Sequence, residues 1–348
     1  MSPRDRIARE IERQGGWVPF ARYMQLALHE PGTGYYASGA RKFGAEGDFV
    51  TAPELGDLFG RTLSRQLAAI PGRRVLELGA GSGALAEVLI RELDCDYFIL
   101  ETSAELRERQ KKLLGKKAVH LEKLPENFEG AIVANEVADA LPVHVVHWTK
   151  EGILERGVTR ELAWADRPAT GELLQESEKI SPEVPYVSEI NLLLAPWIRG
   201  LVGCLARGAI FVFDYGFPRR EYYHPQRAAG TLMCHYRHQS HADPFARPGE
   251  EDITAHVDFT AAAQAAREAG AEVLGYASQA QFLVNCGITD VLGEANVENA
   301  LHYAPIASQA QKLLSPAEMG ELFKVLAVGK GLDPQMIGFS SGDRRHTL

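Results

Sequence analysis

Short apolar runs alternate with amphipathic stretches along most of this chain from residue 73 onward. An uninterrupted apolar run is typical of a parallel strand buried on both faces, and apolar residues at helical spacing predict a helix. The expected strands cover residues 74–78, 97–101, 118–121, 130–135, 209–214, 271–276 and 323–329. Strands that alternate with helices predict a doubly wound α/β fold around a mostly parallel, seven-stranded sheet.

The segment before the first of these strands has a different pattern. Residues 3–14 and 19–29 carry apolar side chains at helical spacing, and residues 31–60 are rich in glycine and aromatic residues. A helix over about 54–69 then leads to the first strand. Because loops of this composition usually carry function, we expect residues 1–70 to form a helical N-terminal cap with a substrate loop.

Two insertions interrupt the predicted core. The core is expected over residues 71–335, with insertions at 144–187 and 215–257 and a tail at 336–348, of which residues 340–348 are expected to be frayed. The first insertion has the pattern of antiparallel strands and leads to a predicted helix over about 188–206. The second is rich in glycine, proline, histidine and tyrosine and has no regular pattern.

The composition is that of an ordinary globular protein, with 45% hydrophobic and 24% charged residues. The net charge of −9 does not indicate a nucleic-acid surface, and no apolar run reaches the length of a membrane span. Four scattered cysteines without a CxxC motif favour a reducing compartment. Because Asp5, Glu10 and Glu12 fit neither a secretory signal nor a transit peptide, we expect a cytoplasmic protein.

The strongest local signal is VLELGAGSGALA, residues 75–86. Gly79, Gly81 and Gly83 allow a tight turn between a strand and a helix, and such a turn offers backbone N–H groups and a positive helix end to a ligand. By itself this turn fits NAD and S-adenosylmethionine (SAM) alike. Glu77 precedes the first glycine by two residues and gives the E-x-G-x-G-x-G pattern, which resembles a methyltransferase motif and favours SAM.

Polar residues follow two further strands close to this turn. Glu101 lies about 20 residues after the glycines, where an acid commonly binds ribose hydroxyls, and capping of the next helix is its alternative role. Thr102 is assigned to the same cofactor site. Asn135 and Glu136 end the fourth strand, whose carboxyl end faces the reactive centre of the cofactor. Asp139 joins this site or caps a helix.

A run of metal-binding residue types lies in the second insertion. Cys234 and His235 are followed by His238 and His241. Zinc sites use cysteine and histidine at short spacings, but this spacing matches neither a zinc finger nor an H-E-x-x-H helix. The sequence therefore favours a polar loop on the substrate side and predicts no metal.

Several separated motifs resemble the MidA-like SAM-dependent methyltransferases, a family that includes the mitochondrial arginine methyltransferase that assists assembly of respiratory complex I. The motifs follow in order along nearly the whole chain: GTGYY (32–36), GDFVTAPELGDLFG (47–60), ELGAGSGALA (77–86), ETSAELRERQ (101–110), NEVADALPV (135–143), FDYGFP (213–218), GTLMCHYRH (230–238), DITAHVDFT (252–260) and MGELFKVL (319–326). One departure is Ala104, where the family's E-x-S-P motif has its proline. The resemblance implies a class I methyltransferase fold, SAM as the cofactor and arginine in a partner protein as the acceptor.

The expected reaction is in-line attack of a guanidinium nitrogen on the methyl group, for which acidic side chains must orient the cation. Glu136 is the first candidate and Glu54 the second, and Asp139 and Asp48 are further carboxylates near the predicted site. Thr51 is assigned to the cofactor site. The partner expected from the resemblance is a respiratory complex subunit.

Three other functions stay open at this point. They are a SAM-binding assembly factor without catalysis, a small-molecule N- or O-methyltransferase, and an NAD-dependent oxidoreductase. The identity of the acceptor, the number of methyl groups added and the oligomeric state, a homodimer included, also stay open.

Overall fold

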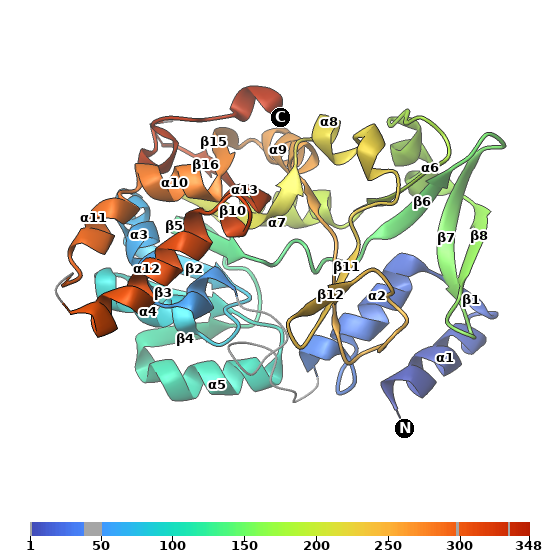
Figure 1. Cartoon of the computed structure of the whole chain (residues 1–348), viewed down its shortest axis with the longest axis horizontal. Helices are drawn as coiled ribbons and strands as arrows, with labels where there is room; N and C mark the ends of the chain where they lie inside the picture. Colours follow the sequence, from blue (N-terminus) through green and yellow to red (C-terminus); the bar gives the residue numbers. More distant parts are fainter. Residues whose placement is uncertain (1, 38–50, 297–298, 333–334) are drawn as a thin grey trace.

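A computed structural model describes residues 2–37, 51–296, 299–332 and 335–348 of the chain (Figure 1). The helices are α1 (Pro3–Arg13), α2 (Phe20–His29), α3 (Asp57–Leu67), α4 (Ala84–Glu92), α5 (Ala104–Leu114), α6 (Gly171–Glu178), α7 (Leu194–Cys204), α8 (Arg219–Tyr222), α9 (Phe259–Glu268), α10 (Gln279–Asn285), α11 (Ile288–Gly293), α12 (Ala300–Leu314) and α13 (Met319–Leu322). The predicted helices at 3–14 and 19–29 are confirmed as α1 and α2.

The central sheet has the order β15-β16-β10-β5-β2-β3-β4, and the short strand β14 pairs with β10. Its strands are β2 (Arg74–Leu78), β3 (Asp96–Leu100), β4 (Ala118–Leu121), β5 (Phe128–Asn135), β10 (Leu205–Phe217), β14 (Val257–Asp258), β15 (Glu272–Ser278) and β16 (Phe323–Lys330). Only β16 runs antiparallel to its neighbours, β10 and β15. The predicted doubly wound, mostly parallel fold is therefore confirmed. The sheet contains the seven expected strands and, in addition, the two-residue strand β14.

Helices cover both faces of this sheet, as the uninterrupted apolar strands require. Along β5, Ala131 and Val133 pack into one core with apolar residues of α3, α4, α10 and α11. Ile132 and Ala134 point to the opposite face and pack against α7 and α9. Because successive side chains of a strand alternate between faces, one short strand contributes to two cores.

A second, antiparallel sheet is built from the first insertion and the N-terminal segment. It contains β1 (Trp17–Pro19), β6 (His144–Trp148), β7 (Ile153–Thr159), β8 (Trp164–Pro168) and β9 (Tyr186–Ile190). Strand β1 pairs with β7, and residues of α1 and α2 share a core with this sheet. Figure 1 shows these elements together on the right of the molecule.

The predicted helix over 188–206 is wrong at its start. Residues 186–190 form β9, which pairs antiparallel with β6, and the helix α7 begins only at Leu194. The Oδ1 atom of Asn191 accepts hydrogen bonds from the backbone N–H groups of Leu193 and Leu194, both at 3.0 Å. This asparagine turn ends the strand and starts the helix, because its side chain satisfies N–H groups that the first helical turn leaves free.

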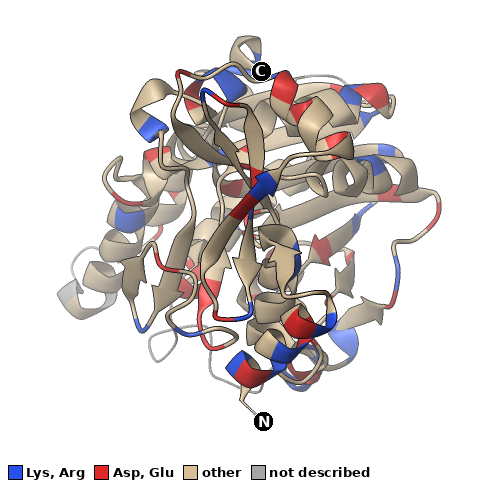
Figure 2. Cartoon of the chain, turned by 90° about the vertical axis from the view of Figure 1, so that its right-hand side faces the viewer, with Lys and Arg blue, Asp and Glu red and all other residues tan. Residues whose placement is uncertain are grey.

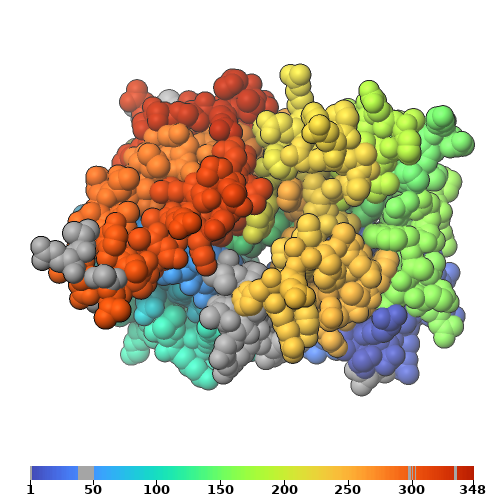
Figure 3. Space-filling view, viewed as in Figure 1, coloured from blue at the N-terminus to red at the C-terminus, as the bar shows by residue number. Residues whose placement is uncertain are grey.

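A third, three-stranded sheet lies in the second insertion. It consists of β11 (Met233–Tyr236), β12 (Gln239–His241) and β13 (Asp252–Thr254), in the order β12-β11-β13. Cys234 and Ile253 pack against residues of α2. In Figure 3 this hairpin, drawn in gold, stands beside a hollow in the surface that separates it from the red-orange C-terminal helices.

The expected fraying of residues 340–348 is also wrong. Just before them, Met336 and Phe339 are buried, and the ring of Phe339 packs edge-on against Phe282 with centroids 5.3 Å apart. The backbone N–H of Arg344 donates to the carbonyl oxygen of Tyr276 at 2.6 Å. The last residues therefore cover β15 and α10, because their apolar side chains pack against this face of the core.

Acidic and basic residues alternate along the ribbon in Figure 2, and both kinds occur in α1. Within the described ranges, every helix is too short or too polar to reach across a bilayer.

Candidate active site

The glycine turn lies between β2 and α4, at the carboxyl edge of the central sheet. Gly79, Gly81 and Gly83 all have positive φ angles, of 59°, 55° and 88°. The N–H of Gly79 donates to the carbonyl oxygen of Leu100 at 3.0 Å, which ties the turn to the neighbouring strand β3. A side chain at position 79 would bring its Cβ to 3.1 Å from the Cγ2 atom of Val137. The turn therefore needs glycine both for its conformation and for the space above it.

Glu101 follows β3 and is almost fully buried beside this turn. Its Oε1 atom accepts a hydrogen bond from the N–H of Ser103 at 2.9 Å, and its Oε2 atom accepts one from Gln110 at 3.1 Å. Gln110 also donates to the carbonyl oxygen of Gly81 at 2.9 Å. Ser103, and not Glu101, caps α5 with its side chain. Glu101 is thus held rigidly at the cavity wall, as a ribose-binding acid needs to be.

Glu77 lies at the floor of the same region. Its carboxylate accepts a hydrogen bond from the hydroxyl of Tyr97 at 2.7 Å, and burial raises its pKa to about 7. The carboxylate of Glu101 acts in the same direction, whereas the Tyr97 hydrogen bond lowers the pKa. Two acids this close to a ligand cavity favour a ligand that carries hydroxyl or ammonium groups.

Asn135 and Glu136 end β5 next to the glycine turn. Glu136 has a φ of 54°, a left-handed conformation that is uncommon for a residue with a side chain, and its N–H is held by the carbonyl oxygen of Phe213 at 2.9 Å. The Nδ2 atom of Asn135 donates to Glu136 at 3.2 Å. The Oδ1 atom of Asn135 is buried and has no partner among the described residues, so it is an available acceptor for a cofactor ammonium group.

A group of buried acids lies beyond Glu136. Asp214 on β10 accepts hydrogen bonds from the N–H groups of Ala138 and Asp139, at 2.9 and 3.2 Å, and Asp139 itself is buried. Burial raises the pKa of Glu136, Asp139 and Asp214, in the case of Asp214 to about 8, and mutual repulsion of the acids adds to the rise. No helix begins at Asp139, so its alternative role as a helix cap is excluded.

One cavity of about 370 Å³ joins these groups. It is lined by most of the residues that the sequence predicts: Thr51, Glu54, Glu77, Gly79, Gly81, Glu101, Thr102, Asn135, Glu136 and Asp139. The volume lies in the range of small-molecule sites.

Of the two other predicted residues, one lies elsewhere and one falls outside the described ranges. Gly83 does not line the cavity and instead forms the left-handed N-cap of α4. Asp48 lies outside the described residues. Glu54 accepts a hydrogen bond from the hydroxyl of Ser82, which places it over the glycine turn.

The other wall of the cavity comes from residues to which the sequence assigned no individual catalytic or binding role. They are His29, Tyr36, Tyr215, His235, Asp252 and Thr254. The hydroxyl of Tyr36 donates to Asp252 at 2.9 Å, and the ring of Tyr36 stacks on His29 with centroids 5.7 Å apart. All of these residues except His29 lie in motifs that carry the family resemblance. Tyr36 also lies in the predicted substrate loop, and His235 in the run that the sequence favours as a polar loop on the substrate side.

Comparison with known proteins agrees with this site. The sequence pattern of a family described as S-adenosyl-L-methionine-dependent methyltransferases matches residues 58–277. A solved structure from Burkholderia thailandensis, bound to S-adenosyl-homocysteine, is 48% identical and superposes with a TM-score of 0.94 over 99% of this chain and 97% of that chain.

Curated relatives are more distant. The mitochondrial protein arginine methyltransferase NDUFAF7 of Xenopus tropicalis is 28% identical over 93% of this chain and 86% of its own length. The human protein of the same name is 26% identical, over 90% of this chain and 80% of its own length.

The fold and the site together define a class I methyltransferase that uses SAM as its cofactor. Within this class, the chain belongs to the MidA-like family of SAM-dependent methyltransferases.

Proposed function

We propose that this enzyme transfers the methyl group of SAM to a guanidinium nitrogen of an arginine in a partner protein. The observation that carries the proposal is a group of four acids, which we call the acidic wall: Glu136, Asp139, Asp214 and Asp252. Glu136, Asp139 and Asp252 line the cavity, and the fully buried Asp214 accepts a hydrogen bond from the backbone of Asp139. A guanidinium is cationic at any ordinary pH, and its planar fork pairs well with carboxylates.

Three members of the acidic wall have no ion-pair partner in the part of the chain that the structure describes. Among the described residues, no lysine or arginine forms an ion pair with Glu136, Asp139 or Asp214. Buried carboxyls without a countercharge are costly in their ionised form, which is why burial raises their pKa values. A cationic acceptor would remove this cost, so the wall is suited to a guanidinium and poorly suited to an anionic or apolar acceptor.

The acids and their neighbours have separable tasks in the proposed reaction. SAM supplies the methyl group. A guanidinium bound at the acidic wall lowers the pKa of Glu136, which then orients the cation as a carboxylate and accepts its proton. The Tyr36 hydroxyl keeps Asp252 directed at the cavity. The protein thus contributes mainly alignment and a matched charge environment.

The names of the curated relatives support the same acceptor, because NDUFAF7 proteins are named as protein arginine methyltransferases. By the family resemblance, the partner we propose is a respiratory complex subunit.

The test is methyl transfer from labelled SAM into a cell lysate that lacks the enzyme. We expect a labelled protein band whose acid hydrolysate contains methylarginine, and we expect labelling to be about 100-fold slower with the Glu136→Gln variant. Label in small molecules alone would identify a small-molecule methyltransferase. Calorimetric binding of SAM without any transfer would identify a binding module. Either result would refute the proposal.

A further inference from the structure

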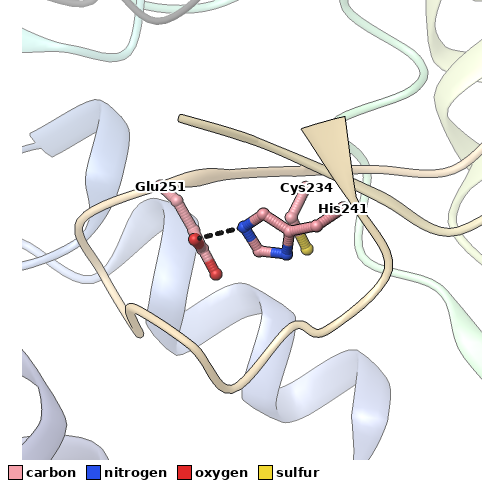
Figure 4. A group of neighbouring side chains, drawn as sticks. All are labelled: Cys234, His241 and Glu251. Atoms are coloured by element: carbon pink, nitrogen blue, oxygen red, sulfur yellow. Dashed lines mark hydrogen bonds and ion pairs between the residues drawn. The ribbon is translucent and has the colours of Figure 1, made fainter. Parts of the chain in front are cut away.

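The third sheet brings together three side chains that are well separated along the chain. Cys234 lies on β11, His241 on β12 and Glu251 immediately before β13 (Figure 4). Cys234 and His241 are direct partners across the hairpin, so their side chains share one face of the sheet. Glu251 precedes Ile253, the other partner of Cys234, by two residues and reaches the same face. One donor atom of each lies within 4.8 Å of the others.

Burial of two of the three donor side chains would enclose an ion on one side. The side chains of Cys234 and Glu251 are buried, with 1% and 0% of their residue surface exposed, whereas the side chain of His241 is 29% exposed. An ion can therefore enter past His241 and would be enclosed on the opposite side. This geometry provides three protein donors with a fourth position toward solvent.

Every polar contact of the three side chains that the structure shows comes from the same short segment. His241 Nε2 lies 3.1 Å from Glu251 Oε2, and the N–H of Asp243 donates to His241 Nδ1 at 3.3 Å. The N–H of Arg247 donates to Glu251 Oε1 at 3.3 Å, and its guanidinium lies 3.8 Å from Oε2. These contacts hold the imidazole and the carboxylate next to each other on this face of the sheet.

We propose that Cys234, His241 and Glu251 bind a zinc ion. A thiolate, an imidazole and a carboxylate are the three ligand types that zinc takes in proteins, whereas calcium and magnesium prefer oxygen alone. Neighbouring ligands of tetrahedral zinc lie about 3.5 Å apart, so side-chain shifts of about 1 Å are enough to close the site. Binding releases the thiol proton to solvent, and no redox step is involved.

The proposed ion would lie on the face of the third sheet opposite to the cavity. His235 and Asp252 each follow a ligand by one residue, they are direct partners across β11 and β13, and both line the cavity. Since neighbouring side chains of a strand point to opposite faces, an ion on one face fixes the backbone that presents these two residues on the other. The zinc site does not depend on which acceptor the enzyme uses.

The experiment begins with the full-length protein, dialysed against a chelator, loaded with excess zinc and desalted. We expect about one zinc per chain by elemental analysis. The Cys234→Ser and His241→Gln variants should lose nearly all of it. Cys95→Ser and His346→Gln are matched controls outside the third sheet, and both should retain it. Circular dichroism and calorimetric SAM binding, unchanged in each variant, would show that the protein is folded.

A measurement on the wild-type protein covers the case in which a variant does not fold. Cobalt(II) bound by a thiolate gives a charge-transfer absorption in the near ultraviolet, which should appear at one equivalent and disappear on addition of zinc. Absence of this absorption would overturn the proposal, and so would zinc that is retained by folded Cys234→Ser protein. Because the readout is metal content, it fails or succeeds separately from the proposed arginine methylation.

Discussion

Replacing Glu77 by glutamine removes one titratable group from the floor of the cavity and hardly changes the shape of the side chain. Burial raises the pKa of Glu77 from its ordinary value of 4.5 to about 7. A group whose pKa is raised by folding stabilises the folded state at low pH, and this stability is lost as the pH rises through the folded pKa. Here the loss falls between about pH 4.5 and pH 7.

The size of the effect follows from the two pKa values. Each pKa unit corresponds to about 1.36 kcal/mol, so the ionised carboxylate costs the folded protein about 3 kcal/mol above pH 7. Between pH 5 and pH 8, the free energy of unfolding of Glu77→Gln should rise by about 2.5 kcal/mol relative to that of the wild type. Tyr97 can still donate its hydrogen bond, because glutamine keeps an acceptor oxygen.

Urea unfolding at these two pH values, without SAM, measures the difference. Glu87→Gln, at an exposed position on α4, is the matched control and should show no comparable rise. Calorimetry at pH 8 should also show weaker SAM binding by Glu77→Gln. A rise below about 0.5 kcal/mol would refute the raised pKa, because it lies within the error of such measurements.

Three further outcomes are expected. Glu136→Gln should lower the rate of methyl transfer at saturating SAM by about 100-fold and leave the SAM dissociation constant within about twofold, which steady-state kinetics and calorimetry would check. Because the pKa of Asp214 is raised to about 8, the acidic wall gains negative charge as the pH rises. The kcat/KM for the acceptor should therefore increase between pH 7 and pH 9, and a flat profile would contradict this. Gly79→Ala should destabilise the protein by about 1–2 kcal/mol, because φ is 59° and the new Cβ lies 3.1 Å from Val137. It should also weaken SAM binding at least tenfold, whereas Gly203→Ala, which has open space around its Cβ, should bind SAM normally.

The central sheet could be predicted from the sequence because each strand is an uninterrupted apolar run. Burial on both faces leaves such a run no other stable arrangement, and the glycine turn marks the first connection. Strand β9 was missed for the opposite reason: Ser188 and Glu189 interrupt its apolar positions, and it pairs with β6, some 40 residues earlier in the chain.

The cofactor side of the site could be predicted and the acceptor side only in part. Glu77 and Glu101 lie at fixed distances from the glycine turn, so local spacing indicates their role. Tyr36 and Asp252 are separated by more than 200 residues and meet only because the N-terminal segment and the second insertion fold over one sheet edge. The local pattern of hydrophobic positions gives no information about a contact between residues so far apart in the sequence. For the same reason, Glu251 could not be recognised as a companion of Cys234.

The place of β16 in the central sheet has a consequence for the synthesis of the protein. This strand is the last of the sheet to leave the ribosome, yet it lies between β10 and β15 and hydrogen-bonds to both. Until about residue 330 has emerged, β10 and β15 each present an unpaired apolar edge, which is a template for aggregation. Nascent chains that stall before this point should therefore depend on chaperones. A premature stop only 30 residues from the end should prevent the whole protein from folding.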